Sequence, residues 1–210
     1  MKKETGRIEA FSDGVFAIAI TLLVLDLGVP SPGHFAETLL ADWTSYLAYL
    51  AAFLTIASIW LHHHSVFQHI GRLGPAALLF NLLLLLGVSL VPWPTSLIAA
   101  AIRDGSRSDE VVAIVVYTIT SVLVSIAWAG IGFSLSRHPD WLLHPDDARW
   151  MRVTGYQGAL AAVPSLLAAA ISPFAPLVSL LIFLLVPLYF ILVTTISRRA
   201  PGAHGTAETR

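Results

Sequence analysis

The chain contains six apolar stretches, each about long enough to cross a membrane. A spanning helix needs about 20 mostly apolar residues, because its backbone polar groups must be paired within the hydrocarbon. Hydrophobic residues make up 56% of the 210 positions and charged residues only 12%, about half the share in soluble proteins. We therefore predict an all-α membrane protein with a single six-span domain at 1–200. The predicted spans are 8–27, 43–67, 76–99, 111–135, 153–171 and 177–196.

The lysine and arginine residues predict how these spans are oriented. Cytoplasmic loops carry an excess of basic residues, and six spans place both termini on the same side. That side holds ten of the twelve basic residues: Lys2, Lys3, Arg7, Arg72, Arg137, Arg149, Arg152, Arg198, Arg199 and Arg210. Arg103 and Arg107 fall on the other side. We expect a multi-pass protein of the plasma or inner membrane with cytoplasmic termini and a disordered polar tail at 201–210.

A polar motif, Arg7-x-x-x-Phe11-Ser12-Asp13, opens the first span. Ionisable groups inside a membrane are costly and mark functional or assembly sites by default. With successive residues about 100° apart, one stripe of this helix is centred on Ile18. Its other members are Arg7, Phe11, Gly14, Thr21, Leu22 and Leu25. Ser12 and Asp13 project to the far sides, so we expect them to face neighbouring helices.

The second span ends in three adjacent histidines, His62, His63 and His64. Consecutive helical residues point about 100° apart and cannot converge on one ion, so we expect no metal here. We expect one histidine to turn inward and bond Ser12, Asp13 or a neighbouring span, and the pattern leaves open which one. Asn81, alone in an apolar run, is typical of hydrogen bonding between membrane helices.

Other function classes find little support. The net charge of −1 provides no basic field for nucleic acid, and the chain has no cysteine for disulfides or thiolate metal sites. It carries no GxSxG or HExxH motif and no usable carboxylate cluster within one span. We therefore expect a protein that is not an enzyme, uses no cofactor and acts within or across the bilayer.

Three motifs together resemble the transmembrane protein 175 potassium channels. They are Arg7-x-x-x-Phe11-Ser12-Asp13, Trp60-x-x-His63-x-x-x-Phe67, and Asn81 followed eleven residues later by Pro92. The six-span plan is similar over nearly the whole chain, and one such unit is typical of the prokaryotic members. No Thr-Val-Gly-Tyr-Gly filter is present, which also fits this family.

The resemblance implies a potassium-selective channel, a homotetramer whose central pore is lined by four copies of the first helix. Ile18 then matches the constriction, with Thr21, Leu22 and Leu25 further along the pore. The resemblance also implies an assembly network of Arg7, Phe11, Ser12, Asp13, Trp60, His63 and Asn81. Potassium ions, the lipid bilayer and other copies of the chain are the implied partners.

Two questions remain open at this stage. A proton-coupled or proton-conducting transporter would also place Asp13 and His63 in the membrane, as a relay. Against a carrier, the Phe-Ser-Asp element has no second copy in the chain, whereas transporters often contain internal repeats. Asp26, at the outer end of the first span, either concentrates cations at a pore mouth or is a solvated acid at a helix end.

Overall fold

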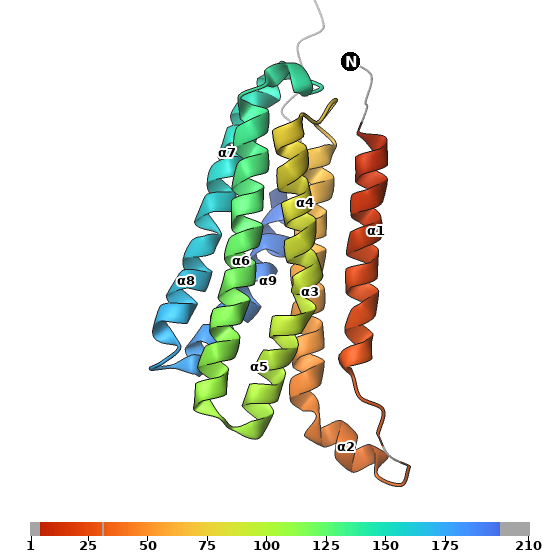
Figure 1. Ribbon diagram of the computed structural model, residues 1–210, viewed down its shortest axis with the longest axis vertical. Coiled ribbons are helices and arrows are strands. Elements are labelled where there is room, and N and C mark those ends of the chain that lie inside the picture. The colour runs from red at the N-terminus through yellow and green to blue at the C-terminus, as the bar shows by residue number, and fades with distance from the viewer. Residues whose placement is uncertain (1–4, 31, 198–210) are drawn as a thin grey trace, which may run out of the picture.

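The computed structural model describes residues 5–30 and 32–197, without the side chains at 176, 177 and 189–197. This part of the chain is a helical bundle without a β-sheet (Figure 1). Its elements are α1 Gly6–Leu22, η1 Leu23–Asp26, α2 Phe35–Ala41, α3 Trp43–Phe67, α4 Pro75–Leu90, α5 Pro92–Asp104, α6 Arg107–Ser136, η2 Pro139–Trp141, η3 Pro145–Asp147, α7 Ala148–Leu160, α8 Ala162–Ile171 and α9 Pro176–Ser197. The tail predicted at 201–210 lies outside the described residues, as do Lys2, Lys3, Arg198, Arg199 and Arg210.

Within residues 5–30 and 32–197, five segments are long and apolar enough to cross a membrane. They are Gly6–Asp26, Trp43–Phe67, Pro75–Asp104, Arg107–Ser136 and Pro145–Ile171. The second segment coincides with the predicted span 43–67. Each of the other four contains most of the corresponding predicted span. α9 covers the predicted sixth span, 177–196, but its apolar stretch within the fully described residues, Val178–Leu188, is shorter. The all-α membrane class is therefore confirmed.

Proline residues divide two of the predicted spans into pairs of helices. α4 gives way to α5 at Val91, immediately before Pro92. α7 gives way to α8 at Ala161, three residues before Pro164. Proline has no N–H for the carbonyl four residues earlier, so the carbonyl of Leu160 loses its helical donor. In both places a second helix continues in roughly the same direction (Figure 1).

The helices of these two spans extend beyond the predicted limits. The third was expected to end at Ala99, but α5 continues to Asp104 and includes Arg103. The fifth was expected to begin at Val153, but α7 begins at Ala148 and includes Arg149 and Arg152. Charged residues in the first or last turns of a span reduce the apparent hydropathy there, although long arginine side chains reach the interface from such positions.

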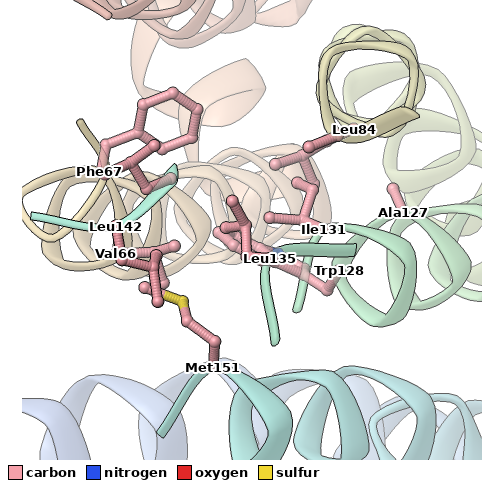
Figure 2. Close-up of a cluster of buried hydrophobic side chains, with 11 residues drawn as sticks. Val66, Phe67, Leu84, Ala127, Trp128, Ile131, Leu135, Leu142 and Met151 are labelled. Carbon is pink, nitrogen blue, oxygen red and sulfur yellow. The ribbon is translucent and has the colours of Figure 1, made fainter. Parts of the chain in front are cut away.

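α6 runs through the middle of the bundle and packs against α4, α5, α7, α8 and α9. Its contact with α7 is unusually close at Gly132, where a Cβ atom would lie 2.3 Å from the backbone nitrogen of Gly155. A buried apolar cluster surrounds this crossing (Figure 2). Its labelled side chains are Val66, Phe67, Leu84, Ala127, Trp128, Ile131, Leu135, Leu142 and Met151.

α1 stands at the opposite edge of the bundle from α7 and α8 (Figure 1). It packs chiefly against α3 and α4. Phe16, Ala19 and Leu23 are buried on that side, among side chains that include Ile56 of α3 and Val88 of α4. The first helix is thus attached to the rest of the chain along one face.

The turn between α3 and α4 is joined to the loop that follows α6. The backbone N–H groups of Gly71 and Arg72 both donate to the carbonyl of Trp141, at 2.9 and 3.0 Å. In return, the N–H of Leu143 donates to the carbonyl of His69 at 2.9 Å. The Trp141 ring covers Gly74, whose missing side chain makes room for it. These contacts tie together two loops that are about 70 positions apart in sequence.

Candidate pore helix and its polar network

The outward face of α1 carries a row of large apolar side chains with little cover from the chain itself. Ile18 is 61% exposed, Leu22 52% and Leu25 74%, and Phe11 is also exposed. Thr21 lies on the same side, and its hydroxyl donates to the carbonyl of Ile18 at 3.0 Å. The structure therefore places the four predicted pore residues together on the face of α1 that points away from α3 and α4.

A buried chain of hydrogen bonds joins α1, α3 and α4. Ser12, Asn81 and His63 are each no more than 1% exposed. Nε2 of His63 donates to Oδ1 of Asn81 at 3.0 Å, because an amide oxygen can only accept. Nδ2 of Asn81 then donates to Oγ of Ser12 at 3.1 Å. A single amide thus connects the two flanking helices by using both its acceptor and its donor.

Aromatic side chains enclose this histidine. The ring of Phe67 stacks on His63 with ring centroids 4.0 Å apart, and Phe16 of α1 lies at 5.4 Å. Packing of this kind excludes water, and buried polar groups depend on their protein partners where water is absent. Ser12, Asn81 and His63 therefore form a closed polar contact inside an apolar bundle.

Asp13 takes part in a separate contact. It is exposed, and its Oδ1 accepts a hydrogen bond from the indole Nε1 of Trp60 at 2.9 Å. Trp60 in turn stacks on His64, with ring centroids 5.6 Å apart. We expected the polar end of α1 to share one network, but the structure divides it into a buried serine contact and an exposed aspartate contact.

The three histidines have three different surroundings. His63 points inward to Asn81, which answers the question that the sequence left open. His62 packs edge-on against Trp128 of α6, and His64 contacts Gln68 and Trp60. Across residues 5–30 and 32–197, no three histidine or acidic side chains converge in a way that could hold a metal ion.

Two members of the implied assembly network lie apart from it. Arg7 and Phe11 are both exposed on α1. They fall on the same side as Ile18, so within one chain they do not reach His63 or Asn81.

Asp26 lies at the end of η1, beside a small cavity. Its Oδ2 accepts a hydrogen bond from the hydroxyl of Ser96 in α5 at 2.7 Å. The cavity has a volume of about 80 Å³, and both Asp26 and Arg103 line it. Arg103 also pairs with Asp42 at 3.2 Å. The carboxylate is therefore tied to α5, although it remains exposed.

Sequence reasoning missed two residues that complete this arrangement. Phe16 lies two positions before Ile18, which turns it to the opposite face, and that spacing could have indicated its burial against α3. Ser96, the partner of Asp26, gave no signal, because a contact between positions 70 residues apart depends on the tertiary fold.

Comparison with known proteins identifies the family. A family model described as "Endosomal/lysosomal potassium channel TMEM175" matches residues 7–92. A solved structure titled as a lysosomal potassium-selective channel TMEM175 homolog from Chamaesiphon minutus is 34% identical, with a TM-score of 0.72. That similarity covers 91% of this chain and 98% of the other. The chain belongs to the TMEM175 family.

Relatives within the TMEM175 family carry two kinds of name. One from Streptomyces collinus, named a potassium channel, is 45% identical over 137 residues, covering 64% of this chain and 66% of its own. One from Chamaesiphon minutus, also named a potassium channel, is 50% identical over 103 residues, covering 47% and 51%. The alignments thus span between half and two thirds of these relatives. A Gallus gallus relative named a proton channel is 34% identical over 150 residues, covering 66% of this chain and 30% of its own.

The matched residues of the TMEM175 model, 7–92, include α1, α3, α4 and the start of α5. The exposed stripe and both polar contacts of α1 lie within this range. A second solved structure, of a variant of the potassium channel MtTMEM175, has a TM-score of 0.66 at 21% identity and shows the shared fold.

Proposed function

We propose that this protein is a potassium-selective channel in which four copies surround a central pore lined by α1. Residues 1–200 act as one six-span unit, with α9 as the sixth span and α2 outside the membrane. Both termini lie in the cytoplasm of a bacterial-type cell, in the plasma or inner membrane. The arginines Arg7, Arg72, Arg137, Arg149 and Arg152 support this orientation, because their helix ends lie together in the bundle (Figure 1).

One observation carries the proposal, namely the exposed stripe on α1. A helix that packs on one side only and exposes Ile18, Leu22 and Leu25 on the other either faces lipid or lines a shared surface. Lipid and a pore both account for these apolar side chains. Similarity to the structure titled as a potassium-selective TMEM175 homolog favours the pore.

The proposed mechanism is passage through a ring of four Ile18 side chains. A narrow apolar ring excludes water and blocks conduction, whereas a slightly wider ring lets an ion pass. An ion must shed part of its hydration shell there, and potassium holds its water less tightly than sodium. Leu22 and Leu25 extend the apolar wall, and the Thr21 hydroxyl, bonded to the Ile18 carbonyl, keeps its lone pairs available.

The polar contacts of Ser12 and Asp13 hold α1 in place on the N-terminal side of Ile18. The Ser12–Asn81–His63 chain fixes the rotation of α1 against α3 and α4, and Trp60 holds Asp13 at the neighbouring position. Asp26 attracts cations toward the outer end of the pore. Its tie to Ser96 supports a fixed carboxylate rather than a freely moving one.

A flux assay on purified protein in liposomes tests the proposal. Wild-type protein should pass potassium faster than sodium. Ile18→Ala and Ile18→Asn should raise the flux of both ions severalfold and reduce the preference for potassium. Ile119→Ala is the matched control, because Ile119 is 64% exposed on α6, away from α1. Wild-type flux and selectivity in both Ile18 variants would contradict the proposed ring.

Proton conduction is the second candidate, favoured by the relatives that are named proton channels. The hydrogen bonds provide little support for a relay from His63 to Asp13. His63 ends at Asn81, and a neutral amide does not take up and release protons as acids and bases do. A proton gradient in the same liposomes measures this activity directly, alongside the two cations.

A further inference from the structure

A groove on the surface of the bundle is lined by no residue of α1. It has a volume of about 370 Å³ and an almost entirely apolar lining from α4, α6 and the junction of α7 and α8. Its main lining residues are Phe80, Ile126, Ala129, Gly130, Ala159 and Ala162. α7 and α8 stand at the opposite edge of the molecule from α1 (Figure 1), and α1 contributes no lining residue, so the groove is not part of the proposed pore.

Small residues and the break in the helix create this groove. A Cβ atom at Gly130 would lie 2.3 Å from the Phe80 ring, so the ring occupies the space where a side chain would be. Ala159 and Ala162 flank Ala161, where α7 ends and α8 begins. Nothing larger than a methyl group from these two residues fills the space between α6 and the α7–α8 junction.

Two arginines lie on the same helix faces as groove residues, nearer the loop that joins α6 and α7. Ile126, Gly130, Phe133 and Arg137 share a face of α6, and Arg152 shares a face of α7 with Ala159, because these spacings are whole numbers of turns. The antiparallel helices bring Gly132 against Gly155 and Phe133 against Tyr156. That register places Arg137 and Arg152 at nearly the same height.

Both arginines are exposed, and neither forms an ion pair within the described part of the chain. The nearby acids Asp140 and Asp147 pair instead with Arg72 and His69. The remaining acid of the loop, Asp146, is exposed in the short turn η3. The two guanidinium groups are therefore available to an anion from outside the chain.

We infer that this groove binds an anionic phospholipid, with an acyl chain along Ala129 and Ala159 and the headgroup phosphate at Arg137 and Arg152. The span from Arg152 to Ala159 is about 10 Å along the helix, within the roughly 15 Å depth of one leaflet's hydrocarbon. Tyr156 lies between them and is exposed, as aromatic residues at the membrane interface commonly are. Basic groups at this level attract anionic headgroups.

Native mass spectrometry of the purified full chain tests the inference, because it counts retained lipids without measuring flux. The probes are phosphatidylglycerol and phosphatidylcholine with identical acyl chains. Wild-type protein should retain phosphatidylglycerol preferentially. Arg137→Gln and Arg152→Gln should each reduce its retention about fivefold, the effect of one basic residue at an anionic surface. Arg107→Gln, which removes a charge from the opposite end of α6, should leave retention near wild type.

Ala159→Leu tests the acyl-chain part of the site. Ala159 is exposed, so a larger apolar side chain should fill the groove without disturbing the fold, and retention should fall. Ala170→Leu, an exposed position of α8 that does not line the groove, is the control. Equal retention of the two lipids, or an equal loss in Arg107→Gln, would overturn the inference. Cross-linking between Ala159→Cys chains would also overturn it, by showing that a second copy covers the groove.

Discussion

His63 is the residue whose surroundings are most completely defined. Its ring lies between Phe16 and Phe67, and Nε2 donates to Asn81. His62, one position earlier, is only partly buried and makes an edge contact with Trp128. These adjacent histidines provide a matched pair, because the same substitution removes a buried hydrogen bond from one and mainly a packing contact from the other.

We predict that His63→Ala destabilises the protein more than His62→Ala does. Truncating His63 leaves the Asn81 oxygen buried without its donor, which costs about 1–3 kcal/mol. The protein is heated to a series of temperatures, and size-exclusion chromatography then measures the fraction of oligomer that remains intact. If both variants lose half of the oligomer at the same temperature, the hydrogen bond to Asn81 contributes little.

A substitution at Asp13 distinguishes the potassium-channel hypothesis from the proton-relay hypothesis. Asp13→Asn keeps an oxygen that accepts from Trp60 but cannot release a proton. We predict that this variant assembles normally and passes potassium, whereas Asp13→Ala reduces the yield of folded oligomer. Chromatographic yield and liposome flux are measured together. Loss of proton flux with normal assembly in Asp13→Asn would favour the relay.

The hydrogen-bonding partners of the polar side chains were only partly predictable from the sequence. Asn81 was identified as a polar residue in an apolar helix, because its cost in hydrocarbon demands a partner. The identity of that partner was not predictable, since Ser12 is 69 positions away and any of several polar groups could have served. Pairings of this kind depend on helix rotation and height, which hydropathy does not encode.

The close contact between helices α6 and α7 requires glycine at positions 132 and 155, where the two backbones meet. We predict that Gly132→Ala destabilises the protein by about 1–3 kcal/mol, the usual cost of overpacking, because the new Cβ meets the backbone of Gly155, which cannot rotate away. Gly28→Ala is the control, with nothing within 4 Å of its new Cβ. Thermal melting of both variants provides the comparison, and equal melting would show that the helices can separate at no cost.

Element limits were predictable where the apolar pattern ends abruptly. Trp43–Phe67 was predicted to the residue, since Asp42 precedes it and Gln68 follows. The helices extend past the predicted limits at α5 and α7, where arginines occur in the last turn of α5 and in the first turns of α7. α2 was not predicted at all, because Phe35–Ala41 is only 7 residues long and lies in a region interpreted as an external loop.

For the whole molecule, the proposed channel places the exposed face of α1 against other copies of the chain. We predict that Leu25→Cys chains form disulfide-linked dimers in mild oxidant, because four copies around one axis bring this position close together. The wild-type chain has no cysteine, so each variant has one reactive thiol. Val112→Cys, exposed on α6, is the control and should remain monomeric on a denaturing gel. Efficient linkage through Val112 instead would place a different face at the axis.

The subunit arrangement was not predictable from the pattern alone. An apolar stripe on a membrane helix is equally compatible with lipid and with a pore lining. The chain's own packing narrows this choice, since it leaves Ile18 and Leu25 uncovered while burying Phe16 and Leu23. Family membership then favours the pore.

The backbone tie between the α3–α4 turn and Trp141 bears on how the protein is made. When residues 69–72 leave the ribosome, the carbonyl and N–H groups that will pair with them are about 70 residues from being synthesised. The first helices therefore enter the membrane with this turn unfinished, and the loop after α6 completes it later. A nascent chain halted before Trp141 would contain Ser12, His63 and Asn81. It would lack the loop whose backbone hydrogen bonds hold the α3–α4 turn.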